Sequence, residues 1–379
     1  MISLTAMACG AEASTRGLLA GPRFGKGGRG PVVVWNSTGR CNLSCSHCYA
    51  DAAAEAADEL STKEALELLR GAADAGAPVV LFSGGEPLLR DDLVELVAAC
   101  ARLGPAPALS TNGSLLSTSL ARSLAGAGCA YVGVSLDGNA ATHDALRGAP
   151  GAWREAVAGL RAAREAGMRT GVRFVLSRRN AVELPAVMAA AREEGVCRFC
   201  LYHLVYSGRA DAGEDVSPEE RRGIVERLID EAGKAEDGFE LLTVDGYADG
   251  VLAVLRASGV RRAAAEDLLA RQGGCPAGVG IVAVGPTGLV HPCQFWRSAV
   301  LGDARRRPLP EILADGGPLA ERLARKSEFV TGRCGECAHK AVCAGCRVRA
   351  FAFSGDEWGE DPACPLTDEE LSQNALCGR

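Results

Sequence analysis

The chain has 379 residues, of which 47% are apolar and 23% are charged, and its formal net charge is −6. This length suits two or three domains of ordinary globular composition. No long basic run is present, which argues against a nucleic-acid partner, and no apolar stretch of about eighteen residues suggests a membrane span. Because no secretion signal is evident, we expect a cytoplasmic location and attribute the sixteen cysteines mainly to metal binding rather than to disulfides.

The order of the predicted elements indicates an α/β fold. Residues 1–30 are glycine-rich near their end and are expected to be a flexible lead-in. Short β-branched runs predict strands at Val32–Trp35, Val79–Phe82, Ala108–Thr111, Tyr131–Leu136, Gly171–Leu176 and Phe199–Val205. Alanine- and leucine-rich stretches predict helices at Thr62–Ala73, Leu93–Arg102, Ser117–Ala125, Trp153–Glu165 and Leu184–Glu194. Strands that alternate with helices imply a parallel sheet, and six such units suit a partial (β/α)6 TIM-like barrel over residues 31–240.

The pattern changes after the barrel. A further helix is predicted at Ser217–Gly233, with Pro218 in its first turn. We expect 241–272 to be a helical connector. After about Gly273 cysteines and glycines dominate, so we predict a small cysteine-rich domain at 273–379.

Three cysteines after the first predicted strand carry the strongest signal. Cys41, Cys45 and Cys48 have the spacing C-x3-C-x2-C. Three thiolates on one loop can hold three irons of a [4Fe–4S] cluster and leave the fourth iron without a protein ligand. A site that is one ligand short keeps a position for a reacting molecule. A zinc loop and scattered buried thiols remain the alternatives from spacing alone.

Polar motifs end the next three predicted strands, where parallel barrels carry function. Ser83-Gly84-Gly85-Glu86-Pro87 follows the second strand, Ser110-Thr111-Asn112-Gly113 ends the third, and Ser135-Leu136-Asp137-Gly138 ends the fourth, before His143-Asp144 and Arg147. Taken singly, Asn-Gly and Asp-Gly are common turn pairs and Arg147 is an ordinary surface charge. Their order along one barrel is what makes the set informative.

Together these motifs resemble the signature of the radical S-adenosylmethionine (SAM) superfamily. The resemblance implies that Cys41, Cys45 and Cys48 hold a catalytic [4Fe–4S] cluster whose open iron binds SAM, which is cleaved to a 5′-deoxyadenosyl radical. It implies that Glu86 binds the SAM amino group, Ser135 the ribose and Arg147 the carboxylate, with Tyr49 near the adenine. It assigns SAM contacts also to Gly84, Gly85, Ser110, Asn112 and Asp137. His47 lies between two ligands but is given a loop role. The chemistry requires an electron donor such as flavodoxin or ferredoxin.

A second cysteine set resembles the SPASM/twitch-like extension of such enzymes, which carries auxiliary [4Fe–4S] clusters. The resemblance assigns one cluster to Cys334, Cys337, Cys343 and Cys364. It assigns Cys275, Cys293 and Cys346 to another, which lacks one cysteine and thus has an open iron, a non-cysteine ligand such as Asp or His, or does not form. The alternative for Cys334 to Cys346 is a zinc ribbon. Cys100, Cys129, Cys197 and Cys200 are interpreted as small buried hydrophobes; Cys9 and Cys377 are left unassigned.

Stretches such as 31–36, 202–209 and 291–296 resemble the branch that alters tetrapyrrole side chains in haem d1 synthesis and in the siroheme-dependent haem route. A tetrapyrrole carries carboxylates, so its pocket should offer cations and aromatic walls. The candidates at the last barrel strands are Arg173, Tyr202, His203, Tyr206 and Arg209. Packing or a loop charge explains the same residues without a substrate. A ribosomally made peptide is the alternative substrate, and a non-enzymatic iron–sulfur or zinc scaffold is the third hypothesis.

Overall fold

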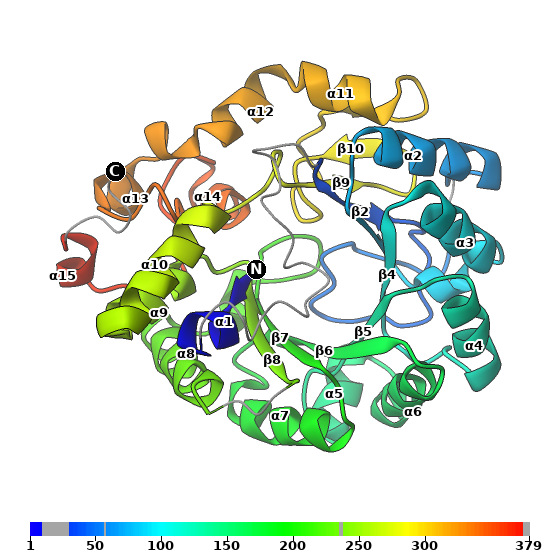
Figure 1. Ribbon diagram of the computed structural model, residues 1–379, viewed down its shortest axis with the longest axis horizontal. Helices are drawn as coiled ribbons and strands as arrows, with labels where there is room; N and C mark the ends of the chain where they lie inside the picture. The colour runs from blue at the N-terminus through cyan, green and yellow to red at the C-terminus, as the bar shows by residue number, and fades with distance from the viewer. Residues whose placement is uncertain (10–29, 57, 235–237, 374–379) are drawn as a thin grey trace.

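Parallel strands curve into an open barrel in the computed structural model, which describes residues 1–9, 30–56, 58–234 and 238–373. Figure 1 shows this curved sheet with helices around its outside. Seven strands pair in chain order, each parallel to the next. They are β2 (Val32–Asn36), β3 (Val79–Ser83), β4 (Ala106–Thr111), β5 (Tyr131–Ser135), β6 (Arg169–Leu176), β7 (Arg198–His203) and β8 (Glu240–Val244). The α/β fold class and its parallel sheet are therefore confirmed.

Helices follow the barrel strands and cover the sheet from outside. They are α2 (Thr62–Asp74), α3 (Leu93–Leu103), α4 (Thr118–Gly126), α5 (Ala140–Arg147), α6 (Ala152–Glu165), α7 (Leu184–Glu193), α8 (Pro218–Ala232), α9 (Ala248–Arg256) and α10 (Gly259–Gln272). Short 3₁₀ turns occur at Pro87–Leu89, Ala181–Glu183, Ala212–Glu214 and Lys326–Glu328. A capping box begins α2: the Ser61 hydroxyl accepts from the backbone N–H of Glu64, and the Glu64 carboxylate accepts from the backbone N–H of Ser61.

The barrel has one parallel strand more than the six that the sequence predicted. Strand β8 occupies 240–244, at the start of the segment expected to be a helical connector. Its five residues are followed by two helices in the sequence. An apolar run this short has no clear periodicity, so the sequence pattern alone does not distinguish a strand from a helix here. The connector is helical only from Ala248 onward, in α9 and α10.

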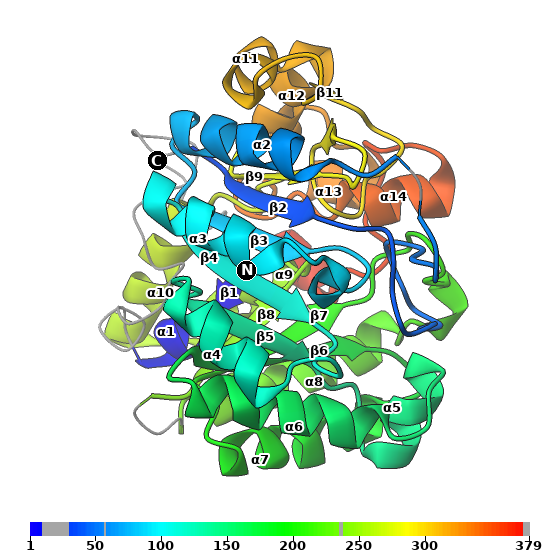
Figure 2. The ribbon, with the colours of Figure 1, turned by 90° about the vertical axis from the view of Figure 1, so that its right-hand side faces the viewer.

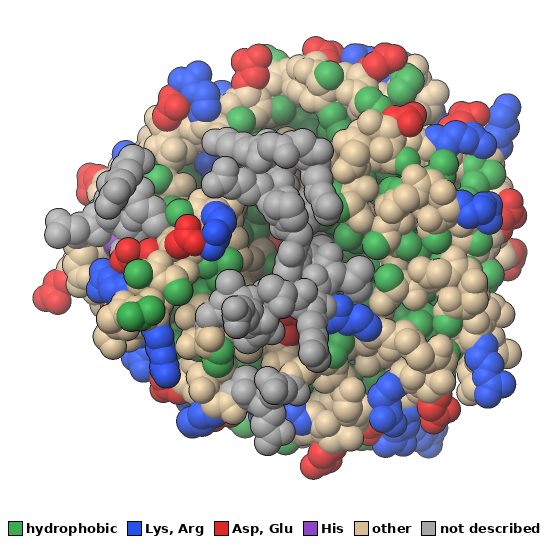
Figure 3. All heavy atoms as spheres, in the orientation of Figure 1, with side chains coloured by type: hydrophobic (Ala, Val, Ile, Leu, Met, Phe, Trp, Pro, Cys, Tyr) green, Lys and Arg blue, Asp and Glu red, His purple; other side chains and the backbone are tan. Residues whose placement is uncertain are grey.

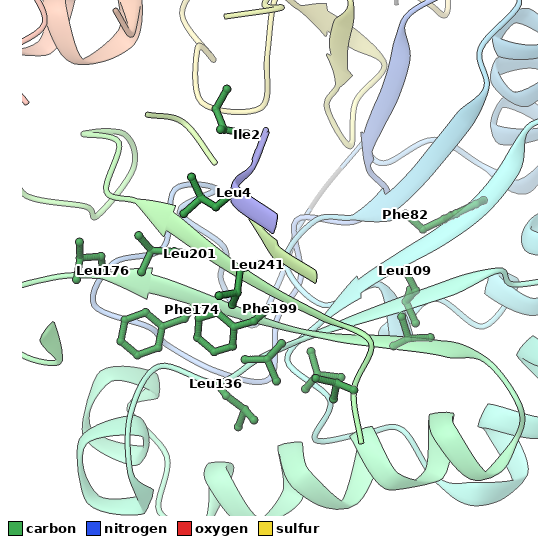
Figure 4. Close-up of a cluster of buried hydrophobic side chains, with 14 of the residues drawn as sticks. Ile2, Leu4, Phe82, Leu109, Leu136, Phe174, Leu176, Phe199, Leu201 and Leu241 are labelled. Carbon is green, nitrogen blue, oxygen red and sulfur yellow. The ribbon is translucent and has the colours of Figure 1, made fainter. Parts of the chain in front are cut away.

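The first nine residues are folded and do not form a flexible lead-in. Strand β1 (Ile2–Ser3) pairs antiparallel with β8, and α1 (Leu4–Cys9) follows it directly. Ile2 and Leu4 are each 1% exposed. Figure 4 shows both side chains among the buried residues of β6, β7 and β8. Two apolar residues in so short a segment carry no periodic signal, so burial here depends on tertiary packing. Residues 10–29 lie outside the described part of the chain.

The cysteine-rich segment extends the same sheet. Strand β9 (Ile281–Val284) runs parallel to β2, and β10 (Leu289–His291) and β11 (Gly302–Asp303) continue antiparallel from it. The helices after them are α11 (Leu309–Asp315), α12 (Gly317–Ala324), α13 (Gly332–Glu336), α14 (Arg347–Ser354) and α15 (Asp368–Leu371). Figure 2 shows α14 on the side toward which β2 points. This places the second cysteine set near the carboxyl ends of the strands.

Around the rim of the face in Figure 3, acidic and basic side chains alternate, with apolar side chains between them. Across the described ranges, no helix has the length and apolar character needed to span a bilayer.

Candidate active site

The carboxyl ends of the barrel strands surround a large cavity. It encloses about 1070 Å³, counting the part that is open to solvent. Cys41, Cys45 and Cys48 all line it. The other predicted site residues on its wall are Tyr49, Gly84, Gly85, Ser110, Asn112, Ser135, Arg147, Arg173, Tyr202 and His203. The fold thus brings residues from six successive strand ends to one space.

The three cysteines of the first motif suit a cluster with an open position. None of them is in a disulfide. The Cys41 sulfur accepts from the backbone N–H of Leu43 at 3.4 Å, and the Cys45 sulfur lies 3.5 Å from a guanidinium nitrogen of Arg147. Burial raises the pKa of Cys41 to about 11, and the charges of Cys45 and Cys48 contribute to the rise. Three thiols on the wall of one cavity, one of them beside the Arg147 cation, fit a group that binds them as thiolates.

Tight packing fixes the backbone of this loop. A Cβ on Gly85 would lie 2.1 Å from the carbonyl oxygen of Arg40, and a Cβ on Gly208 would lie 2.4 Å from that of Cys48. Arg209 donates to the carbonyl oxygen of Cys45 at 2.9 Å and to the Asp51 carboxylate at 2.8 Å. Arg209, a predicted substrate residue, therefore holds the cysteine loop and does not appear on the cavity wall.

Glu86 lies behind the cavity wall. Its side chain is fully buried and accepts hydrogen bonds from the Thr111 hydroxyl at 2.7 Å, from the Asn112 backbone at 2.8 Å and from the Leu88 backbone at 3.1 Å. Burial raises the pKa of Glu86 to about 7, against the lowering effect of these hydrogen bonds. In this structure Glu86 ties the end of β3 to the end of β4 and thereby positions Asn112.

A buried ion pair lies beside the first cysteine set. Arg147 and Asp137 are paired, and the Asp137 carboxylate also accepts from the backbone of Val175 at 2.7 Å and lies 3.2 Å from His47. Burial by itself would raise the pKa of Asp137, but the charge of Arg147 and the hydrogen bond from His47 hold that pKa well below its usual range. Asp137 thus lies beneath Arg147, off the cavity wall, whereas His47 lines the cavity and contacts Asp137, and its loop role stays a prediction.

Other predicted SAM residues face the cavity with polar partners close by. The Tyr49 hydroxyl donates to Asn36 at 2.9 Å, and its ring meets Phe295 edge-on at 5.1 Å. The Asn112 amide lies 4.0 Å from the Cys41 sulfur and donates to Asn42 at 3.0 Å. Ser110 and Ser135 complete this side of the wall.

Three of the five predicted substrate residues line the cavity. The Arg173 guanidinium lies 4.6 Å from the Tyr202 ring centre. Both ring nitrogens of His203 are engaged, by Asp249 at 2.6 Å and by Arg221. The Tyr206 hydroxyl donates to Asp215 at 2.8 Å, outside the cavity wall. Tyr206 and Arg221 both bind Asp215 and so support His203 from behind.

Two wall residues to which the sequence assigned no role come from the C-terminal region. Gln294 and Phe295 reach the cavity from the segment after β10. The Ser207 hydroxyl donates to the Phe295 carbonyl at 2.8 Å, which joins this segment to the end of the barrel. The position of Gln294 directly after Cys293 was the available signal, but only the fold shows that it faces the first cysteine set.

A second, smaller cavity gathers four of the auxiliary cysteines. Cys334, Cys337, Cys343 and Cys364 all line this space of about 550 Å³. Arg333 and Lys340 lie on the same wall. These are the four residues that the resemblance assigned to one cluster, and four thiols beside cations fit a group with a complete set of cysteine ligands.

The remaining three auxiliary cysteines meet elsewhere. Cys293 and Cys346 are each 8% exposed and pack in one buried cluster, against which Cys275 lies. Burial, followed by the charges of Cys275 and Cys346, raises the pKa of Cys293 well above its usual value. Within the described ranges no three His, Cys, Asp or Glu side chains converge on the position of a single metal ion.

Of the four cysteines predicted to be small buried hydrophobes, three are buried: Cys100, Cys129 and Cys200. The fourth, Cys197, is half-buried, and its thiol donates to a backbone carbonyl at 3.1 Å. Cys9 is exposed, and Cys377 lies outside the described residues.

The barrel and its three-cysteine cavity define an enzyme that binds SAM at an iron–sulfur cluster. The chain belongs to the radical SAM superfamily: the model of that family matches residues 35–189. The chain is 42% identical over 355 residues to Fe-coproporphyrin III synthase of Methanosarcina barkeri. The matched region covers 90% of this chain and 89% of the relative. The chain is also 39% identical to pre-heme d1 synthase of Dinoroseobacter shibae, over 92% and 89% of the two chains.

Solved structures confirm the fold through the cysteine-rich region. SuiB of Streptococcus suis, bound to its precursor peptide SuiA, superposes with a TM-score of 0.72 at 20% identity, over 89% of this chain and 76% of that one. The two chains therefore share their fold along most of this chain.

Proposed function

We propose that this enzyme modifies a carboxylate side chain of a tetrapyrrole, by removing or oxidising it. The relatives named Fe-coproporphyrin III synthase and pre-heme d1 synthase, each matched along about nine tenths of the chain, support this substrate class. We further propose that Cys334, Cys337, Cys343 and Cys364 hold an auxiliary cluster and that Cys275, Cys293 and Cys346 hold another. The clusters imply an electron donor such as flavodoxin or ferredoxin, and a reducing compartment such as the cytoplasm.

The environment of Arg173 is the observation that supports the proposal most directly. Its guanidinium faces the cavity from β6, and it stacks on Tyr202. No carboxylate of the described residues pairs with it, whereas the neighbouring Arg147 is bonded to Asp137. A guanidinium fork suits a carboxylate, and a half-buried cation without an anion provides a place for one. A tetrapyrrole with several carboxylate arms offers such a partner, with a flat ring for the aromatic wall.

The residues on the cavity wall would have different roles. When bound, the cluster and SAM supply a radical that takes a hydrogen atom from the substrate. Cys41, Cys45 and Cys48 would hold the cluster, and the paired Arg147 keeps a positive charge beside their sulfurs. Arg173 and Tyr202 would orient the substrate arm on the opposite side of the same cavity. Phe295 lines the same cavity from the C-terminal region.

Titration of the reconstituted enzyme with iron coproporphyrin under anaerobic conditions tests the substrate. We expect saturable binding by absorbance and formation of 5′-deoxyadenosine that depends on the porphyrin. Arg173→Ala should weaken binding about 10- to 100-fold, the loss expected for one charged hydrogen-bonded contact. Arg178→Ala, an exposed arginine just after the same strand, is the matched control and should bind as the wild type.

The same assay separates the alternative substrate. If the porphyrin does not bind, and a precursor peptide stimulates SAM cleavage instead, the tetrapyrrole assignment is wrong. An iron octaalkylporphyrin without carboxylates should bind weakly to both the wild type and Arg173→Ala, because it has no arm for Arg173.

A further inference from the structure

A buried guanidinium without a carboxylate partner lies beside the cysteines of the smaller cavity. Arg347 is the first residue of α14 and is 1% exposed. Among the described residues no carboxylate pairs with Arg347, whereas three arginines on the wall of this cavity each have one. Those pairs are Arg221 with Asp215, Arg333 with Asp368, and Arg349 with Asp361. A buried cation is costly without an anion, so Arg347 requires a negative charge from another group.

The polar contacts of Arg347 single out one sulfur. Its Nη1 donates to the backbone carbonyl oxygens of Glu357 and Gly359, at 3.0 and 2.6 Å. Its Nη2 lies 3.8 Å from the Cys334 sulfur, and its Nε is buried and makes no hydrogen bond. The carbonyls are neutral, so of these partners only Cys334 can carry a negative charge. The geometry therefore fits a Cys334 that is bound as a thiolate.

Two local features bring the guanidinium to this sulfur. Gly345 has a φ of +58°, and a Cβ on it would lie 2.7 Å from Nη2 of Arg347 and 3.2 Å from the Cys334 sulfur. A larger residue would thus separate the two groups. Arg347 also stands in the first turn of α14, where the helix dipole disfavours a positive charge. A negatively charged group at Cys334 offsets that cost.

Backbone donors surround the sulfurs of the same set. They are the N–H groups of Asp361 to Cys334 at 3.4 Å, of His339 to Cys337 at 3.3 Å and of Gly345 to Cys343 at 3.4 Å. Hydrogen bonds to the sulfurs and nearby charge are the means by which a protein sets the reduction potential of an iron–sulfur cluster. A cluster held by four thiolates is anionic, and reduction adds a further negative charge. A fixed cation therefore stabilises the reduced form more than the oxidised form.

We propose that Arg347 is the counter-ion of the cluster held by Cys334, Cys337, Cys343 and Cys364, and that its charge raises the reduction potential of that cluster. This role rests on the auxiliary cluster of the proposed function. Arg347 acts through the cluster and not on the substrate. The cluster takes up an electron more readily than the same four thiolates would beside a neutral side chain.

The test uses the full chain with the substitutions Cys41→Ala/Cys45→Ala/Cys48→Ala, which remove the SAM-binding cluster. After anaerobic reconstitution, the auxiliary clusters are reduced with dithionite at controlled potentials and followed by electron paramagnetic resonance. Cys337→Ala in this background identifies the signal of the cluster in question, because that signal is lost. Arg347→Gln should move the midpoint of the same signal to a lower potential without loss of iron. We expect at least a tenfold loss of electron affinity, which is about 59 mV for one electron.

Two further variants separate charge from structure. Arg347→Lys keeps the positive charge and should retain most of the potential that Arg347→Gln loses. Arg325→Gln is the control, because Arg325 is an exposed arginine of the same region that pairs with Glu328, and it should leave the midpoint unchanged. If Arg347→Gln loses the irons of this cluster and Arg347→Lys keeps them, the charge is needed to hold the cluster, which supports the same role.

An unchanged midpoint in Arg347→Gln would overturn the proposal. An equal shift in Arg347→Gln and Arg347→Lys, or loss of the cluster from both, would also overturn it, because the positive charge would then have no part. Each of these results leaves the auxiliary cluster itself standing. If the background shows no signal that depends on Cys337, the auxiliary cluster of the proposed function is wrong, and the role of Arg347 falls with it.

Discussion

Two buried arginine–aspartate pairs, one in the barrel and one in the C-terminal region, stabilise cysteine sites in opposite ways. In the barrel, Arg147 is the partner that lies near sulfur, 3.5 Å from Cys45, and Asp137 anchors it from below. In the C-terminal region Asp361 is the partner next to the site, because it accepts the backbone N–H of Cys346 at 2.7 Å. There Arg349 donates to both oxygens of Asp361 and to the backbone carbonyls of Leu204 and Asp245.

The difference matches what each site has to do. A cation beside thiolates lowers the cost of negative charge in a cavity that also has to admit SAM and substrate. In the C-terminal region the Asp361 carboxylate fixes the backbone of Cys346, while burial raises the pKa of the Cys346 thiol and the charge of Arg349 opposes that rise. The barrel pair thus places its cation directly beside a sulfur, whereas the C-terminal pair contacts the cysteine backbone through its carboxylate.

The largest expected contrast is between cysteines of the two regions. Cys48→Ala should abolish 5′-deoxyadenosine formation, because two thiolates do not hold the cluster that binds SAM. Cys337→Ala should retain SAM cleavage with a chemical reductant but form no modified porphyrin. Chromatography of 5′-deoxyadenosine and of the porphyrin product measures both. Full product formation by Cys337→Ala would show that the C-terminal cysteines play no part in turnover.

Removing the aspartate of either pair should destabilise the fold by a similar amount. Asp137→Ala and Asp361→Ala each leave a buried guanidinium unpaired, which costs about 3–5 kcal/mol. Anaerobic denaturant unfolding measures the loss. The variants should differ in spectroscopy: Asp137→Ala should perturb the SAM-binding cluster and Asp361→Ala an auxiliary one. Losses below about 1 kcal/mol would mean that solvent reaches these pairs.

The sequence predicted the chemistry of the site better than it predicted which residues line the cavity. Cys41, Cys45 and Cys48 form a local pattern, and the glycine and serine motifs occur at strand ends, so their meeting in one cavity follows from a parallel barrel. Gln294 and Phe295 carry no such pattern. They reach the cavity because β9 pairs with β2, a contact between segments about 250 residues apart that no local periodicity encodes.

The sequence also did not predict which partners the side chains of the site bind. The assignment of Glu86 to the SAM amino group stays a prediction, and the sequence did not show that Thr111, Asn112 and Leu88 hold its side chain behind the wall. Arg209 and Tyr206 were expected to meet substrate, yet the cysteine loop and Asp215 bind them. A motif identifies a residue type at a strand end, whereas packing decides which way the side chain turns.

Glu86 offers the smallest and most specific test, because it is a buried carboxylate with no guanidinium bonded to it. Asp137 and Asp361 have pKa values below the usual range, whereas burial raises the pKa of Glu86 from its ordinary value of 4.5 to about 7. Between these two values the folded chain keeps a proton that the unfolded chain has released. Stability should therefore fall as pH rises from about 4.5 to 7, by about 3 kcal/mol for this group.

For Asp137 and Asp361 the pH dependence of stability has the opposite sign. Their folded pKa values lie below the unfolded ones, so their contribution is complete above about pH 4 and is lost only at lower pH. Unfolding free energies measured from pH 5 to 8 should thus separate the two classes. Glu86→Gln should flatten the slope in that window, whereas Asp361→Asn should leave the slope unchanged while lowering stability throughout. An unchanged slope in Glu86→Gln would show that Glu86 is already ionised in the folded chain at pH 5, held by the N–H and O–H donors around it.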